Sequence, residues 1–520
     1  MTDPARPGVI YGLDDKPPFG RAVLLAIQHT LTMFGATVSI PLLFGPAIWE
    51  SGPPAAGDQQ VFIAGLISAV MLCSGIATFL QSTFGTRLPI IQGVSFSFIA
   101  AFFFIINQRA EVAGNTHLMT LQYIAGAVIL GAAVEMVVGF SGLMGWLRRV
   151  LSPVVIGPVI MLIGLALFQH GAPKAGTHWP VAGLTIFLVI LFSLVLARRG
   201  RLFRLFPILL AIVVVVTLCW ILTVTGVFPG DDPATPDFDA HPAYVNLSAV
   251  HAASWVRVNP VDVVFPWGMP RFNLAFFVAV LAGYLASMVE SFGDYHACSH
   301  MAGGGDPTPK QISRGIGFEG LGCALTGVFG GFSSTSYSEN IGVVGITRVG
   351  SRYVVQIAAV ILILLGLFGK FGAISAAIPG PVVGGLYCAL FGLIAAVGVQ
   401  QLAKADLHSD RNLFIAGFSL FMGLSVPAWF LSVDAPAQAG QIKATYYPTV
   451  EGWLTWIGTH WSPGAEGIIE AIGKNGMAVA AIIGLLLDNL IPGTHAERGI
   501  HPPSTIAIGA GDETEVIEGA

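Results

Sequence analysis

Two carboxylates lie one helical turn apart in the stretch MVESFGDYHACSH (288–300), which directly follows the apolar run FNLAFFVAVLAGYLAS. They are Glu290 and Asp294, and residues four apart share one face of a helix. A third carboxylate, Glu339, lies in the polar, glycine-rich break SSTSYSENIGVVGITRVG. Carboxylates inside apolar segments are rare and mark substrate or ion pathways. Two neighbouring carboxylates in a low dielectric cannot both ionise cheaply, so we expect at least one to hold a proton near neutral pH. Such an arrangement suits a proton-coupled carrier, and an ionised Glu339 can accept hydrogen bonds from substrate N–H groups.

The rest of the chain is apolar enough to place these carboxylates in a membrane. Of its 520 residues, 54% are hydrophobic and only 10% are charged, and the mean hydropathy is +0.76. Soluble domains carry about 25% charged residues. The net charge of −5 indicates no nucleic-acid partner. The five cysteines form no CxxC pair, so we expect no disulfide framework, no metal site and no cofactor. The sequence predicts an all-α polytopic membrane protein.

The apolar runs predict about fourteen transmembrane segments, each long enough to cross ~30 Å of hydrocarbon. They lie near 21–44, 60–83, 88–107, 119–141, 150–169, 181–197, 205–228, 271–293, 311–331, 333–347, 351–370, 378–400, 412–432 and 475–495. Segments 3 and 10 are poor helices. LPIIQGVSFSFIAAFFFII (88–106) begins with Pro, Gly and two Ser, and SSTSYSENIGVVGITRV (333–349) has a similarly polar first half. Unwound backbone persists at membrane depth only where it is buried in protein or lines a cavity.

A weak internal repeat relates the two halves of the chain. SPVVIGPVIMLIGLALF (152–168) and PGPVVGGLYCALFGLIAA (379–396) both read Pro-Val-Val, then glycines, then an apolar helix. Segments 3 and 10 hold matching places in halves of seven segments. Since seven is odd, the second half is inverted, which predicts a 7+7 inverted repeat with its site between paired broken helices. If the breaks meet, GVSFSF (93–98) and SYSEN (336–340) can pair like strands and offer N–H groups from two half-helices.

Orientation follows from the basic residues. Most of the 24 lysines and arginines fall in the N-terminal tail and the even-numbered loops, with ARRGRLFR (197–204) as the strongest cluster. Basic residues concentrate on the cytoplasmic side of membrane proteins. We therefore expect a multi-pass protein of the cell (inner or plasma) membrane with both termini in the cytoplasm.

Further residues are candidates for the site. Phe96, Tyr337 and Phe391 are aromatic residues near the breaks that could stack on a flat ring, although an aromatic residue taken alone is more often part of the core packing. His29 in AIQHTLTMF could line the pore or simply pack. No HExxH or GxSxG motif occurs in the sequence, which argues against an enzyme.

The motifs QHTLTMFGATVSIPLL, VESFGDYHAC, SYSENIGVVGITRVGSR and PGPVVGGLY occur in that order, and with them the chain resembles the nucleobase–ascorbate transporter family, also called the nucleobase:cation symporter-2 or uracil–xanthine permease family. The resemblance covers about residues 20–430. It implies that Glu290 and Glu339 bind the base, that the backbone at Phe96 and Ser338 adds contacts, and that Tyr337 and Phe391 line the pocket. Asp294, Glu290 and His29 are the candidates for ion coupling.

The same resemblance implies how the chain is divided. A core domain would hold the substrate and move like an elevator against a gate domain that mediates homodimerisation. The expected parts are an N-terminal tail (1–20), core (21–141 and 271–370), gate (150–228 and 378–495), an extracytoplasmic connection (229–270) and a C-terminal tail (496–520).

The expected function is a secondary symporter that imports a nucleobase. Bacterial uracil carriers typically have His where this chain has Asp294, and ascorbate carriers have Pro where it has Glu339. A carboxylate at position 339 would repel the ascorbate anion, so the combination favours uracil first and xanthine or hypoxanthine next. Protons are the preferred coupling ion, with sodium as the alternative. An anion carrier of the sulfate or bicarbonate type, which shares this architecture, is the second alternative.

Overall fold

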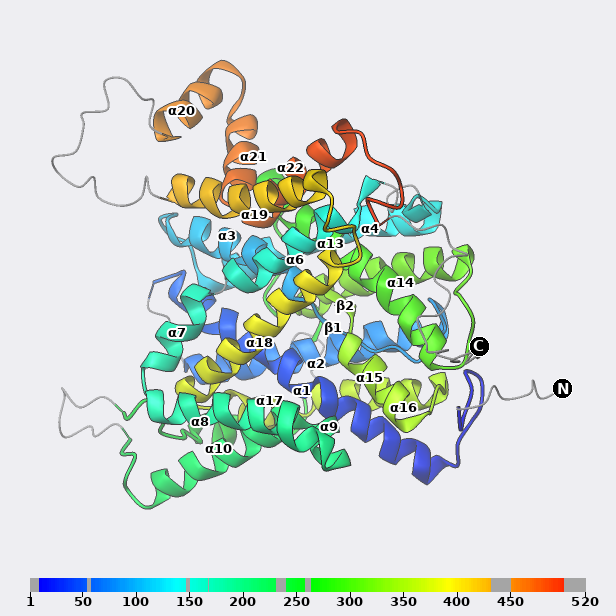
Figure 1. The fold of residues 1–520 in the computed structure, drawn as a ribbon. Helices are drawn as coiled ribbons and strands as arrows, with labels where there is room; N and C mark the ends of the chain where they lie inside the picture. Colours follow the sequence, from blue (N-terminus) through cyan, green and yellow to red (C-terminus); the bar gives the residue numbers. More distant parts are fainter. Residues whose placement is uncertain are drawn as a thin grey trace, which may run out of the picture.

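The computed structural model describes residues 9–53, 58–145, 150–166, 168–230, 240–257, 263–431 and 450–499. The chain is mostly helical, and a short two-stranded sheet lies at the centre of the molecule with helices around it (Figure 1). The helices of the first half are α1 (Phe19–Glu50), α2 (Gln59–Thr83), α3 (Ile99–Ala110), α4 (His117–Ser141), α6 (Pro153–Ala166), α7 (Phe168–Gly176), α8 (Trp179–Ile190), α9 (Arg201–Leu205), α10 (Pro207–Val224) and α11 (Ser248–Ala252). Those of the second half are α13 (Leu274–Met301), α14 (Pro309–Phe329), α15 (Ser338–Thr347), α16 (Arg352–Leu367), α17 (Gly369–Ala376), α18 (Gly380–Leu402), α19 (Asp410–Leu431), α20 (Val450–His460), α21 (Pro463–Gly473) and α22 (Gly476–Leu490).

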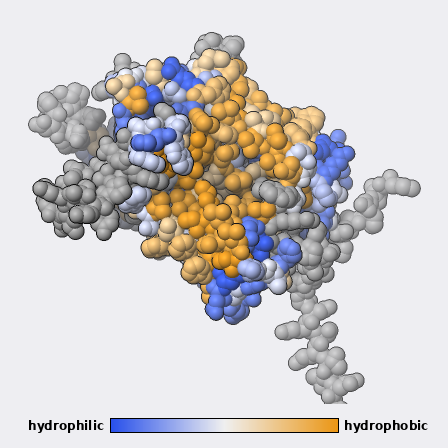
Figure 2. Space-filling view, turned by 90° about the horizontal axis from the view of Figure 1, so that it is seen from above, coloured by the Kyte–Doolittle hydropathy of each residue, from blue (hydrophilic) through white to orange (hydrophobic). Residues whose placement is uncertain are grey.

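Many of these helices can cross a membrane. Within the ranges that the structure describes, nine helices are long and apolar enough to span, or ten if the bent pair α21–α22 is one span. Figure 2 shows a broad, continuous hydrophobic surface bordered by hydrophilic patches, as expected for a protein that faces lipid. Each of the fourteen expected segments overlaps an element of the structure, but the elements of segments 3, 9, 10, 11 and 14 are not among those nine. The protein is therefore a multi-pass membrane protein, and the 7+7 inverted arrangement remains a prediction.

The two interrupted segments pair with each other. Strand β1 (Gln92–Val94) runs antiparallel to β2 (Ser334–Ser336), with Gly93 opposite Thr335. After β1 the chain turns through the 3₁₀ segment η1 (Phe96–Phe98) into α3, and after β2 it enters α15 directly. The pairing satisfies backbone groups that would otherwise be unpaired in the interior. The two interrupted segments thus pair like strands, as expected, but through 92–94 and 334–336, whereas residues 96–98 and 338–340 of the expected pieces are helical.

Close helix packing surrounds this sheet. Helix α14 packs along α4 through small residues, because a Cβ at Gly139 would lie 2.2 Å from the backbone nitrogen of Gly317. Similarly, a Cβ at Gly320 would lie 2.8 Å from the backbone nitrogen of Met136. Helix α13 packs against α4, η1 and β2. Such small-residue contacts are typical of helices in membranes, where backbones approach closely.

Some boundaries differ from the sequence expectations. Segment 8, expected at 271–293, continues as a helix to Met301, so Glu290 and Asp294 lie inside α13 and not at its end. Segment 10 is a strand followed by a ten-residue helix. Helices α17, α20 and α21 were not expected, and the connection 229–270 contains the short helix α11. Residues 1–8 and 500–520 of the expected tails lie outside the described residues.

Candidate functional site

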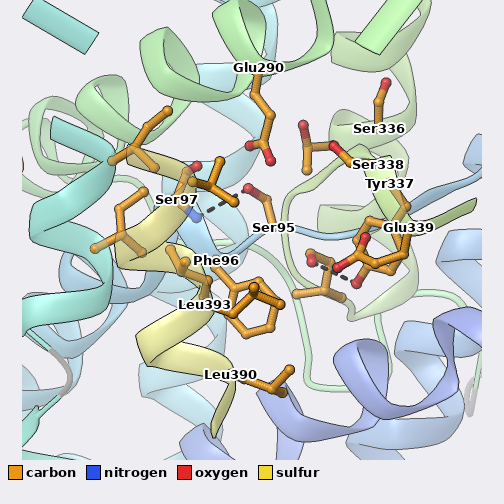
Figure 3. A pocket seen from close by; sticks show the side chains of 16 residues that line it. Ser95, Phe96, Ser97, Glu290, Ser336, Tyr337, Ser338, Glu339, Leu390 and Leu393 are labelled. Atoms are coloured by element: carbon orange, nitrogen blue, oxygen red, sulfur yellow. Dashed lines mark hydrogen bonds between the residues drawn. The ribbon is translucent and has the colours of Figure 1, made fainter. Parts of the chain in front are cut away.

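A cavity lies where the two interrupted segments meet α13 and α18 (Figure 3). It contains about 730 Å³ of empty space, part of it open to the surface. Its polar wall comes from the two breaks and from α13, and its apolar wall comes from α6 and α18. The lining residues are Val94, Ser95, Phe96, Ser97, Ile160, Ile163, Glu290, Thr335, Ser336, Tyr337, Ser338, Glu339, Leu390, Leu393, Ile394 and Val397. A concave, mostly apolar pocket with a few polar groups is the usual form of a small-molecule site.

Glu290 and Glu339 reach this cavity from different elements. Glu290 comes from the middle of α13, and Figure 3 shows its carboxylate pointing into the space between Ser97 and Ser338. Glu339 is in the first turn of α15, where the helix dipole favours a negative charge. Ser338 and Glu339 are solvent-accessible although they follow a run of buried residues, because their accessible surface faces the cavity. The structure therefore brings together the two carboxylates that the sequence selected.

The break in segment 10 is held by hydrogen bonds to its neighbours. The Tyr337 hydroxyl donates to the carbonyl of Val94 at 2.9 Å and accepts from the Thr37 hydroxyl at 3.3 Å. Its ring lies across Gly93, where a Cβ would be only 2.4 Å from the ring carbon Cζ. The glycine is needed because any side chain there would displace the ring. Tyr337 thereby ties the two breaks together and is also one of the residues that line the cavity.

Asp294 lies next to the cavity and not in its wall. It is buried, its Oδ1 accepts a 2.7 Å hydrogen bond from the Ser338 hydroxyl, and its Oδ2 has no partner among the described residues. It is thus one hydrogen bond away from a residue of the wall. A change in its charge would act on the start of α15 through Ser338.

Two other predicted residues lie further from the cavity. Phe391 is buried and stacks on Tyr387, with ring centroids 5.1 Å apart. The residues of that helix that line the cavity are Leu390, Leu393, Ile394 and Val397. His29 is buried in α1, where the amide of Asn340 lies 3.2 Å from its Nδ1 and donates to its carbonyl at 2.9 Å. His29 therefore holds the first turns of α15 to α1.

Two buried carboxylates were missed by the sequence reasoning. Glu319 of α14 is 1% exposed and accepts hydrogen bonds from Ser287, Ser291 and Tyr295 of α13. Glu135 of α4 is fully buried. Both were visible as single carboxylates in apolar runs, GAAVEMVVG and GIGFEGLGC. Such residues mark functional positions in membrane segments, so the same argument that selected Glu290 applies to them.

The cavity can bind a small, uncharged molecule that carries N–H groups. Carboxylates supply acceptors, the serines supply both donors and acceptors, and the aliphatic wall supplies an apolar surface for a ring. No lysine, arginine or histidine is among the lining residues in the described part of the chain, so an anion would find no counter-charge. Apolar helices around such a cavity define a membrane transporter as the class of the protein.

Comparison with known proteins agrees with this class. Residues 20–432 match the model of the Permease family, Xan_ur_permease. The chain is 39% identical to solute carrier family 23 member 2 of Rattus norvegicus, over 96% of this chain and 77% of the relative. It is 36% identical to nucleobase-ascorbate transporter 1 of Arabidopsis thaliana, over 89% of this chain and 88% of that protein. The chain belongs to the nucleobase–ascorbate transporter family, and it is a transporter and not an enzyme.

A more distant likeness concerns the fold alone. The structure of the murine Slc26a9 anion transporter superposes with a TM-score of 0.52 at 12% identity, over 78% of this chain and 65% of that one.

Proposed function

We propose that the protein is a secondary active symporter that imports a nucleobase together with protons. The observation that carries the proposal is that Glu290 and Glu339 line one cavity from two different elements. Uracil, xanthine and hypoxanthine are flat and uncharged, and their ring N–H groups match carboxylate acceptors. We expect uracil to be preferred and xanthine or hypoxanthine to follow.

The flat ring of the substrate would lie against the apolar wall. Phe96 and Leu393 lie on the same side of the cavity in Figure 3, opposite Tyr337 and Ser338. A base stacked on the Phe96 ring could present one polar edge to Glu339 and another to Glu290. Backbone N–H groups at the uncapped start of α15 would bind the carbonyl oxygens, because no side chain caps that helix.

Coupling and movement complete the proposal. Asp294 and Glu290 would bind the coupling ion next to the substrate. The unpartnered Oδ2 of Asp294 also suits sodium, a hard cation that prefers oxygen ligands, so sodium is the second candidate for coupling. The core (21–141 and 271–370) would move as an elevator against the gate (150–228 and 378–495), which would form a homodimer in the cell membrane with both termini cytoplasmic.

Uptake measurements test this function. Radiolabelled uracil, xanthine, hypoxanthine and ascorbate are offered to proteoliposomes, with pH and sodium gradients imposed separately. We expect uptake of a base under a pH gradient, and we expect Glu339→Ala and Glu290→Ala each to abolish it without loss of membrane expression. Glu50→Ala, on the exposed end of α1, is the matched control. Normal uptake of every base by either site variant would show that Glu290 and Glu339 do not form the binding site. Uptake driven by a sodium gradient alone would show that sodium, and not the proton, is the coupling ion.

A further inference from the structure

A second group of carboxylates lies behind the cavity, at the contact between α4 and α14. Glu135 and Glu319 are 0% and 1% exposed, and neither lines the cavity. Their titratable neighbours are Cys323 of α14, Tyr284 and Tyr295 of α13, and the acids Glu290 and Asp294. No lysine, arginine or histidine pairs with either carboxylate in the described part of the chain. A buried pair of acids without a counter-charge cannot hold two negative charges.

The two carboxylates have opposite surroundings. Glu319 accepts three hydrogen bonds, from the hydroxyls of Ser287 (3.1 Å), Ser291 (2.7 Å) and Tyr295 (2.6 Å). Three donors are what an ionised carboxylate needs. Both oxygens of Glu135 are buried, and among the described residues the only donor beside them is the thiol of Cys323, which is a weak one. A carboxyl in that position is stable only as the neutral acid. These surroundings favour the neutral acid at Glu135 and place any negative charge of the pair on Glu319.

Ser291 connects Glu319 to the cavity. Its oxygen lies 3.0 Å from Oγ of Ser336 and 3.2 Å from Oγ1 of Thr335, which both line the cavity. It also accepts a hydrogen bond from the backbone N–H of Ser336 at 3.3 Å. A serine hydroxyl has a single hydrogen, so Ser291 can donate either to Glu319 or to the cavity wall. The protonation of Glu319 decides which, because a protonated carboxyl no longer needs that donor.

We propose that Glu319 binds the transported proton, with Glu135 as the neutral acid beside it, and that Ser291 is the hydrogen-bond switch between this pair and the substrate cavity. The inference deepens the proposed function, and its proton-coupled form rests on that function. It reassigns the transported proton from Glu290 and Asp294 to Glu319, behind the sheet formed by β1 and β2, and leaves Glu290 in the wall of the substrate cavity.

The proton would move from the cavity to Glu319 through the hydroxyls of Ser336 and Ser291, without a net change at either serine. A hydronium ion in the cavity gives a proton to the Ser336 oxygen and leaves as water, and the original hydrogen of Ser336 passes to the Ser291 oxygen. The Ser291 hydrogen then passes to Glu319. At each serine one O–H bond breaks and one forms, and a new O–H bond forms on Glu319, so one proton has moved and the pair changes from one negative charge to none. Ser291 now donates to Ser336, which changes the hydrogen bonds offered to the substrate.

The test separates exchange from accumulation in proteoliposomes of the full chain. Glu319→Gln mimics the protonated residue permanently. We expect base accumulation under a pH gradient to fall on the order of tenfold or more, the size of ordinary coupling between sites. Base-for-base exchange at equal pH, which moves no net proton, should persist. Glu50→Gln is the control for the same chemical change on an exposed helix end. Undiminished accumulation by Glu319→Gln overturns the proposal, as does a loss caused by Glu135→Gln that exceeds the loss caused by Glu319→Gln.

The switch has its own readout. Ser291→Ala should remove the pH dependence of base affinity in a binding assay, and Ser291→Thr, which keeps the hydroxyl, should restore it. An unchanged pH dependence in Ser291→Ala overturns the switch.

A spectroscopic measurement keeps the test independent of transport. The infrared difference spectrum between acid and alkaline pH should contain a carboxyl C=O band that Glu319→Gln lacks. If the wild-type protein moves no base in any gradient, the proposed function fails while this band still tests proton binding at Glu319. Persistence of every such band in Glu319→Gln overturns the assignment.

Discussion

At the scale of single residues, the contact between Gly93 and Tyr337 makes a sharp prediction. A methyl group at position 93 would lie 2.4 Å from the Tyr337 ring, so Gly93→Ala must displace the ring and weaken its bond to Val94. Overpacking of this kind costs about 1–3 kcal/mol. Base affinity should fall by roughly tenfold for each 1.4 kcal/mol of this cost that is taken from the binding free energy of the base. Gly417→Ala on α19, where an added Cβ meets nothing within 4 Å, is the control. Equal affinity in both variants would contradict the role given to this contact.

The residues of the site were predictable to different degrees. Glu290 and Glu339 could be selected because a carboxylate in an apolar run needs a reason, and that argument requires no three-dimensional knowledge. Glu135 and Glu319 satisfy the same criterion, but each stands alone in an apolar run and belongs to no polar motif that would single it out. The placement of Phe391 behind Leu390 depends on the rotation of α18, which an all-round apolar helix does not encode.

At the scale of elements, the buried carboxylate of Asp488 near the end of α22 should contribute strongly to the free energy of unfolding. Asp488 is 1% exposed and accepts hydrogen bonds from Arg411 of α19 at 2.9 Å and from Arg498 at 2.7 Å. Asp488→Ala removes the buried carboxylate that Arg411 and Arg498 share, and breaking a buried ion pair in this way costs about 3–5 kcal/mol. We expect a clearly lower thermal unfolding midpoint in detergent.

The control for this prediction is an exposed ion pair. Asp14, whose side chain is 77% exposed, accepts from Arg352 at 2.7 Å, and Asp14→Ala should cost below about 1 kcal/mol. A midpoint for Asp488→Ala as high as that for Asp14→Ala would show that the α19–α22 contact does not depend on this charge.

The elements themselves were predictable where the chain offers a strong local signal. Gly, Pro and Ser within apolar runs predicted the breaks at segments 3 and 10, because the unpaired backbone there has to find a partner, and β1 and β2 supply it. Helices α20 and α21 gave no such signal, since WLTWIGTHWSPGAEGIIEAIG is too short and mixed to stand out as a span. The sequence predicts an end of this helix near residue 293 because polar residues begin there, whereas α13 continues to Met301 and those polar residues find partners on α14, β2 and α15.

At the scale of the whole molecule, an elevator requires the core to slide past the gate while the core itself stays rigid. Two positions on α1 allow these requirements to be compared. A Cβ at Gly35 would lie 3.5 Å from Cβ of Ile208 on α10, across the expected core–gate boundary. A Cβ at Gly45 would lie 3.5 Å from Cβ of Ile63 on α2, inside the core. Both separations suit a disulfide, whose Cβ atoms lie about 3.5–4.5 Å apart.

The paired cysteine variants should therefore behave differently although their chemistry is the same. After oxidation, Gly35→Cys with Ile208→Cys should lose base uptake, and reduction should restore it, because the crosslink fixes the core to the gate. Oxidised Gly45→Cys with Ile63→Cys should keep its uptake, since it links two helices that move together. Both pairs are made in a Cys388→Ser background, because Cys388 is the cysteine that is not fully buried in the described chain. Full uptake by the oxidised first pair would mean that α1 and α10 do not move apart during transport, and the division into a moving core and a fixed gate would have to be redrawn.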